Sequence, residues 1–403
     1  MTDHTVFTQS RPMGMSGTTL VITIDRLPAW ILPCYGSAWV AMPAVDALAG
    51  RGLVLDNAFA VDANPRRTVD DLLGGARRAV AARGGRIAII TDDDTVVSAE
   101  AADDLTIIAV RPSVHTAADE AATALAKLFE AAVEVVRTGH HDLVWCHAGS
   151  LGRTWDAPDS FRDAYIDPED PPPPSGAAVP MFTVDRDTDP DLLVGLRQVY
   201  AGQLTLLDRC LAPLLDAASP DATVLWAGIR GMPLGLHDRM GPGPMLPYSE
   251  VVRLPVILVD SRGRMAAQRY GGLVTPGDVG ATLASLVGGC DPAVANDTES
   301  PWEPRSLENL LATWTSRDRD RVIVSEPDAA AVITRSWHFI QRRGEDDDAV
   351  MLFAKPDDAF ERCDVADRCP GVVEALVPVA KPALAGDLTE AWRRPLGEAG
   401  REP

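Results

Sequence analysis

Short apolar runs that alternate with helix-length segments are the feature that most constrains this sequence. The first run, at 19–24, is rich in β-branched residues and ends at Asp25, and a segment with helical apolar spacing follows at 43–51. Similar runs and segments then take turns, with strands expected at 87–90, 105–110, 143–147, 223–227 and 255–259 and helices at 68–83, 117–137, 188–217 and 276–288. Such alternation is typical of a sheet with helices on both faces. The sequence predicts an α/β fold with a mostly parallel central sheet sandwiched by helices.

The pattern changes near residue 305. A helix-like stretch at 306–313 precedes short alternating runs near 321–324, 331–340 and 349–353, which predict a small C-terminal antiparallel α+β unit. Four consecutive prolines within 156–180 predict an extended surface loop. The expected organisation is a flexible N-terminus at 1–17, an α/β domain at 18–305, a small C-terminal subdomain at 306–385 and a flexible tail at 386–403.

Composition excludes some partners. The 403 residues carry a net charge of −21, which opposes binding to nucleic acid or to an anionic membrane. The first 17 residues lack the apolar core of a secretory signal, and later apolar stretches are too short to span a membrane. Six scattered cysteines without a CxxC pair do not suggest a disulfide scaffold or a zinc site. We expect a cytoplasmic protein.

Polar residues at the carboxyl ends of the expected strands indicate where a ligand would bind. Asp25, His147 and the segment 228–231 all lie at or just beyond such an end. In open α/β sheets these ends face the ligand crevice.

Several motifs follow one another in a characteristic order. Residues 20–26 precede Cys34-Tyr35-Gly36 and the segments 42–49 and 56–59, and further pieces lie at 200–208, 223–235, 248–255, 275–288 and 305–307. In this order and spacing they resemble the sulfatase family of the alkaline-phosphatase superfamily, over about residues 18–385. The resemblance implies the same α/β fold. It also allows the family's active-site positions to be compared with this chain.

The position of the nucleophile is altered. In the family it is the Cys or Ser of C/S-x-P-x-R, and the matching segment 63–67 keeps Pro65 and Arg67 but has Ala63 in its place. A methyl group cannot attack sulfur or phosphorus. Arg67 either retains an anion contact or is a solvated surface residue.

The family's divalent cation is bound by oxygen ligands from an Asp pair on the first strand and from a later turn. Here Arg26 follows Asp25, and the later turn has Ile229 in the Asp position, followed by Arg230. We therefore expect no metal and no other cofactor. Because an unpaired buried carboxylate is strongly destabilising, we expect Arg26 or Arg230 to place a guanidinium within hydrogen-bonding distance of Asp25.

The family's proton-handling residues are also changed. Its H-x-P-H motif matches 147–150, so His147 remains and Ser150 replaces the second histidine, while the active-site lysine falls near Pro244. His237 matches a family turn. Each of the two histidines either meets a ligand or is structural.

Two functions are consistent with these changes. The first is a catalytically inactive sulfatase-like protein that binds an anionic small molecule or a protein partner. The alternative is a divergent sulfuric or phosphoric ester hydrolase with rearranged catalytic residues, in which Thr68 or Ser150 supplies the hydroxyl nucleophile. Such a hydroxyl stays weakly reactive without a metal or a general base.

Overall fold

The computed structural model describes residues 18–62, 64–96, 102–110, 114–288, 303–308, 319–345 and 348–400. An eight-stranded sheet forms the centre of its larger part, in the order β10-β2-β9-β7-β1-β5-β3-β4. The strands are β1 (Thr19–Asp25), β2 (Leu53–Phe59), β3 (Ile87–Thr91), β4 (Asp104–Ile107), β5 (Leu143–Ala148), β7 (Thr223–Arg230), β9 (Arg253–Val259) and β10 (Gln268–Val274). Only β9 runs antiparallel to its neighbours among these strands. This confirms the predicted mostly parallel sheet.

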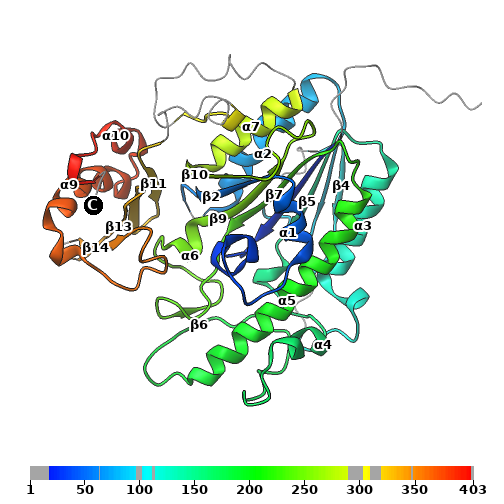
Figure 1. Ribbon diagram of the computed structural model, residues 1–403, viewed down its shortest axis with the longest axis horizontal. Helices are drawn as coiled ribbons and strands as arrows, with labels where there is room; N and C mark the ends of the chain where they lie inside the picture. The colour runs from blue at the N-terminus through cyan, green and yellow to red at the C-terminus, as the bar shows by residue number, and fades with distance from the viewer. Residues whose placement is uncertain are drawn as a thin grey trace, which may run out of the picture.

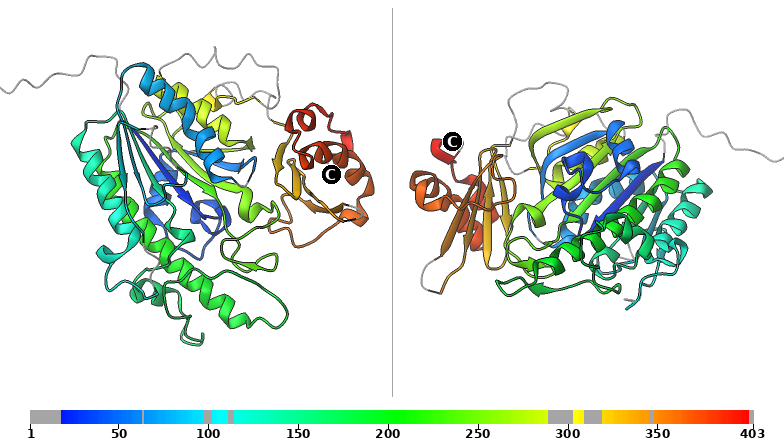
Figure 2. Two further views of the ribbon diagram at one scale, coloured as in Figure 1. Left: turned by 180° about the vertical axis from the view of Figure 1, so that it is seen from behind. Right: turned by 60° about the horizontal axis from the view of Figure 1, so that its bottom comes forward.

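Helices cover both faces of the sheet (Figures 1 and 2). One face packs against α2 (Pro65–Ala82) and α7 (Pro276–Gly288), which also contact each other, and the other against α1 (Pro43–Gly50), α3 (Ala124–Thr138) and α5 (Pro190–Ala217). Local sequence signals set both ends of α3. The Thr123 side chain caps its N-terminus, and Gly139 ends it at a φ of 64°. All seven residues of β1 are buried, as expected for a central strand with both faces covered.

The smaller part is a four-stranded antiparallel sheet in sequential order. It consists of β11 (Val322–Ser325), β12 (Ala329–Ile333), β13 (Trp337–Arg342) and β14 (Ala349–Ala354), with α9 (Pro370–Leu384) and α10 (Leu388–Arg393) on one face. Successive side chains of each strand lie on opposite faces of this sheet. Ile323 and Val332 pack towards these helices, while Val324 and Ala331 join the core of the large domain. One hydrophobic cluster therefore crosses the junction.

Some expectations differ from the structure. The run at 331–340 is not one strand, because a turn at Thr334 separates β12 from β13. The segment expected as a tail from 386 contains α10, with Trp392 and Leu396 buried, so the small unit extends to about residue 400. Strands β2 and β10 and helix α9 are additional elements. The N-terminal segment 1–17 and most of the helix expected at 306–313 lie outside the described residues.

Four short elements shape the edge where the site lies. They are η5 (Ser150–Gly152), α6 (Ser249–Val252) and the two-stranded ladder of β6 (Phe182–Thr183) and β8 (Arg239–Met240). Among the helices in the described ranges, none has both the length and the apolar character needed to cross a membrane.

Candidate functional site

The end of β1 carries a buried carboxylate paired with a guanidinium. Asp25 is 5% exposed and lies opposite Arg230 on β7, after a register shift between Ile24 and Asp25. Arg230 donates to both carboxylate oxygens, from Nη2 to Oδ2 at 2.7 Å and from Nε to Oδ1 at 3.1 Å. This bidentate geometry is the strong form of such a pair. The predicted guanidinium beside Asp25 is thus confirmed, and the residue that supplies it is Arg230.

Arg26 is the more distant of the two candidate cations. Its Nε lies 3.7 Å from Oδ2 of Asp25, beyond a hydrogen bond. Its backbone has a φ of 64°, and its carbonyl accepts a hydrogen bond of 2.7 Å from the Tyr200 hydroxyl, which holds this turn in place. Burial lowers the pKa of Arg26 to about 10. The positive charge of Arg230 also lowers this pKa, whereas the negative charge of Asp25 raises it. Arg26 therefore contributes positive electrostatic potential to the site, but its Nε lies too far from Asp25 for a hydrogen bond.

His147 lies inside the protein on β5. Its Nδ1 is 2.8 Å from Oγ1 of Thr23, and that hydroxyl also accepts from Nε1 of Trp145 at 2.8 Å. Because the Thr23 hydroxyl already accepts from Trp145, its own hydrogen is available to Nδ1 of His147. Burial lowers the pKa of His147 to about 4, although Asp25 and Asp93 favour the charged form. The ring is therefore neutral near pH 7 and forms part of a buried hydrogen-bond network with Thr23 and Trp145.

Ser150 begins η5 and is fully buried, next to a carboxylate that the sequence did not single out. Burial raises the pKa of Asp92, opposed by the amide of Gly149 at 2.5 Å and by the Ser150 hydroxyl. The adjacent Asp93 pairs with Arg153 at 2.7 Å. These acidic residues directly follow β3. Their position at the end of a strand is the sequence signal that could have indicated them.

The other sequence-derived positions do not join this group. Ile229 packs in the hydrophobic core, and Thr68 is buried within α2. Arg67 has a side chain that is 48% exposed and pairs with Asp62 at 3.2 Å and with Asp71 at 3.9 Å. It lines a separate cavity with Trp392. Ala63 lies outside the described residues.

A basic cleft of about 1100 Å³ lies beside Asp25, between the large domain and the small unit. Five arginines and one histidine line it, namely Arg26, Arg230, Arg239, Arg342, Arg343 and His237, and Pro244 is also part of the lining. Glu326 and Asp328 are the acidic members of this lining. Such a concentration of guanidinium groups contrasts with the chain's net charge of −21. Arg239 is distant in the sequence from the adjacent pair Arg342 and Arg343, and we see no sequence signal that unites them.

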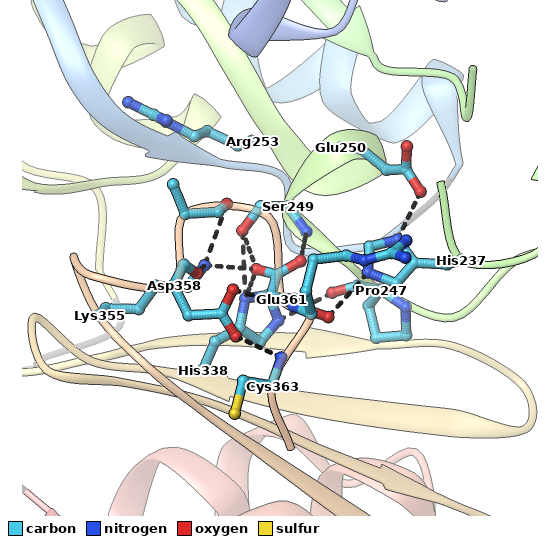
Figure 3. Close-up of polar contacts among 12 residues, drawn as sticks. His237, Pro247, Ser249, Glu250, Arg253, His338, Lys355, Asp358, Glu361 and Cys363 are labelled. Carbon is cyan, nitrogen blue, oxygen red and sulfur yellow. Dashed lines mark hydrogen bonds and ion pairs between the residues drawn. The ribbon is translucent and has the colours of Figure 1, made fainter. Parts of the chain in front are cut away.

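His237 links the cleft to the small unit. Its Nδ1 is 2.7 Å from Oε1 of Glu250, and its Nε2 is 3.1 Å from the carbonyl of Glu361 (Figure 3). Its ring also stacks on Tyr248, with the ring centres 3.6 Å apart. Burial opposes charging, but the hydrogen bonds and charges of Glu250 and Glu361 together raise the pKa of His237. The residue thus has its ring nitrogens engaged within the protein.

These residues do not fit the divalent cation that the sulfatase resemblance implies. Both oxygens of Asp25 accept hydrogen bonds from Arg230, and the end of β7 contributes Gly228 and Ile229, neither of which has a side-chain oxygen. Hard cations need several oxygen ligands. Within the described ranges, no group of three or more His, Cys, Asp or Glu residues is placed to hold a metal ion.

Comparison with known proteins identifies the fold. No protein-family model matches the sequence, and no curated protein matches it. The fold is similar to BT4656 in complex with its substrate D-glucosamine-2-N,6-O-disulfate, with a TM-score of 0.73 at 13% identity over 95% of this chain and 99% of that one. It is also similar to the phosphonate monoester hydrolase of Agrobacterium radiobacter, with a TM-score of 0.68 at 14% identity over 93% of this chain and 95% of that one. The chain therefore has the fold of sulfatases and phosphonate monoester hydrolases, at low sequence identity.

Proposed function

We propose that this protein binds an anionic ligand in the basic cleft and does not carry out metal-assisted ester hydrolysis. The observation that carries the proposal is the bidentate pair of Arg230 with Asp25. It places a fixed cation where a metal ligand of the sulfatase family would be. The site keeps positive charge while its carboxylate is no longer available to a metal ion.

The lining of the cleft supports an anionic ligand. Arg239, Arg342 and Arg343 are exposed, and Arg26 and Arg230 lie deeper, so guanidinium groups occur at several depths. Guanidinium groups suit planar, multi-oxygen recognition of sulfate, phosphate or carboxylate. A cleft of about 1100 Å³ has room for a ligand the size of a disaccharide or a short peptide.

The hydrolase alternative has less support from the geometry. Its two candidate nucleophiles, Thr68 and Ser150, are 2% and 0% exposed. A hydroxyl in that environment has no access to an ester unless the chain opens. We therefore treat hydrolysis as an outcome to be tested.

Binding can be measured by calorimetry with D-glucosamine-2-N,6-O-disulfate, the named substrate of the structural neighbour, and with neutral N-acetyl-D-glucosamine as the matched control ligand. We expect saturable binding of the disulfate alone. The double substitution Arg239→Gln with Arg342→Gln should weaken it at least tenfold, whereas Arg186→Gln, in an exposed loop outside the cleft, should leave it unchanged. Release of sulfate by the wild-type protein, or equal binding by the double variant, would contradict the proposal.

A further inference from the structure

One part of the basic cleft is lined by uncharged residues. We call this part the apolar wall, and it consists of a loop at 242–246 and one residue from the neighbouring segment, namely Met181, Pro242, Gly243, Pro244, Met245 and Leu246. None of these side chains carries a charge, a hydroxyl or an amide. The two prolines also lack an amide hydrogen. The apolar wall therefore offers a ligand apolar contact and few hydrogen bonds.

Met181 and the loop form one continuous surface. A Cβ placed at Gly243 would lie 4.0 Å from both Cγ and Sδ of Met181, so the Met181 side chain lies over this glycine. The two segments are also held together at Gly241, which has a φ of 83° and approaches the carbonyl of Pro180 too closely to leave space for a side chain. Strands β6 and β8 pair next to this contact. The position of Met181 against the loop is therefore set by the backbone.

The apolar wall is accessible from the cleft. Met181 is 70% exposed, and Met245 and Leu246 are half-buried and pack inwards against the core of the large domain. Single exposed apolar side chains are common on proteins, but here several lie together in the lining of a cleft. Methionine side chains adapt readily to the shape of an apolar partner. A ligand that covers this surface would remove apolar area from water, which favours binding.

The charged groups of the cleft come from other segments. Its five arginines lie at the ends of β1 and β7, on β8 and at the end of β13. The acidic lining residues Glu326 and Asp328 directly precede β12, the strand that pairs with β13. Charge and apolar surface are therefore separated within the described lining. A ligand that contacts both parts has an anionic group at one end and an apolar group at the other.

On the basis of the anion binding proposed above, we propose that the ligand of the basic cleft is an amphipathic anion. It consists of a sulfate or phosphate group attached to a short alkyl chain that packs against the apolar wall. A sugar ring suits this wall less well, because its hydroxyl groups would lose hydrogen bonds to water without finding partners there. An aromatic ring also has little to stack on, since the ring of Tyr248 in the lining is already stacked on His237.

A series of alkyl sulfates measures the contribution of the chain. Calorimetry at constant ionic strength compares methyl, butyl and hexyl sulfate, with 1-hexanol as the control that lacks the anionic group. Full burial of one methylene raises the affinity about fourfold, so a chain that is half covered should gain about twofold per carbon. We expect hexyl sulfate to bind at least tenfold more tightly than methyl sulfate, and 1-hexanol to show no saturable binding. The affinity of hexyl phosphate relative to hexyl sulfate distinguishes a phosphate ligand from a sulfate ligand.

Variants locate the chain. Met181→Ser removes an exposed part of the apolar wall and should weaken hexyl sulfate binding at least threefold while leaving methyl sulfate binding unchanged. Met181→Leu should retain the affinity of the wild type. Val114→Ser is the matched control, because Val114 is 73% exposed and lies outside the lining of the cleft, and it should change neither affinity. The double substitution Arg239→Gln with Arg342→Gln should weaken both sulfates by the same factor, since the anionic group and the chain contact separate residues.

The outcomes separate this inference from the proposed function on which it depends. Equal affinities for methyl and hexyl sulfate, with binding of D-glucosamine-2-N,6-O-disulfate retained, would overturn the amphipathic ligand and leave anion binding in place. Full affinity for hexyl sulfate in Met181→Ser would place the chain elsewhere and overturn the inference equally. Absence of binding by the disulfate and by every alkyl sulfate would overturn both proposals.

Discussion

Asp25 and Glu361 are both buried carboxylates at the boundary between the two units, but the protein stabilises them differently. Asp25 is paired with Arg230 from the adjacent strand, and the side chain of Arg230 is 19% exposed to the basic cleft. Glu361 accepts hydrogen bonds from the backbone amide and hydroxyl of Ser249 and pairs with His338 and Lys355, and the His338 ring is fully buried. One carboxylate is coupled to the wall of the basic cleft, and the other to a buried network of side chains.

The difference separates an ion pair at the edge of the proposed binding cleft from a structural connection. At Asp25 the counter-charge reaches the cleft, so it can serve an anionic ligand as well as the carboxylate. At Glu361 the small unit supplies the acid, the Lys355 ammonium and the His338 ring, while Ser249 of the large domain supplies two donors. The Glu361 network therefore connects the two units, and His338 and Lys355 hold the pKa of Glu361 well below its usual range despite burial.

The largest expected effect follows from removing this connection. Glu361→Gln leaves Lys355 without its buried counter-charge and His338 without its carboxylate partner, and it should lower the free energy of unfolding by about 3–5 kcal/mol. The matched control is Asp187→Asn, because Asp187 is exposed and lies 3.8 Å from exposed Arg186. It should cause no resolvable change. Urea denaturation gives the free energy of unfolding of both variants. Equal values for Glu361→Gln and the wild type would contradict the structural role assigned to the network.

The two carboxylate regions should also respond to acid at different pH values. His147 lies near Asp25, and its folded pKa of about 4 is below the unfolded value of about 6.5. Its contribution to stability is therefore present above pH 6.5 and is lost as the pH falls towards 4, by on the order of 3 kcal/mol. Glu361 loses its contribution at lower pH, because its pKa in the folded state is depressed below its usual range.

Unfolding free energies measured from pH 7 to pH 4 test this assignment. His147→Gln should flatten the profile relative to the wild type, whereas His140→Gln, at an exposed position, should not. Parallel profiles for His147→Gln and the wild type would show that His147 is not the group that titrates.

The smallest expected effect concerns metal ions. A ligand present at 100 times its dissociation constant would add about 2.7 kcal/mol to the stability of a protein that binds it only when folded. Since Arg230 occupies both oxygens of Asp25, we expect the same Tm in EDTA and in millimolar Ca²⁺. A reproducible calcium-dependent rise would mean that other oxygen ligands form a site.

Sequence patterns predicted the repeating part of the fold better than its edges. Periodicity located the central strands because they are continuous apolar runs. Helix α9 contains Pro378 and Pro382, which disfavour a helix, yet burial of Leu376, Val379 and Ala383 against the small sheet outweighs that propensity. Strand β10 contains two adjacent glycines at the sheet edge, which weaken the strand signal.

The sequence predicted the part of the candidate site where an arginine stands at a position that holds a metal ligand in the sulfatase family. Arginines at the positions of metal ligands indicated a pair with Asp25, but choosing Arg230 over Arg26 required the strand register and the positive φ of Arg26. The basic cleft was not predictable, because Arg239 meets the adjacent pair Arg342 and Arg343 only through packing of the small unit. The same holds for the Glu361 network.

A double-mutant cycle on Asp25 and Arg230 tests most directly whether a guanidinium has replaced the cation. Arg230→Ala alone leaves Asp25 buried beside the more distant Arg26 and should cost about 3 kcal/mol, whereas Arg26→Ala should cost at most about 1 kcal/mol. With Asp25→Asn in the background, most of the cost of Arg230→Ala should disappear, which gives a coupling free energy of about 1–3 kcal/mol. A coupling near zero for Asp25 and Arg230 would contradict the account.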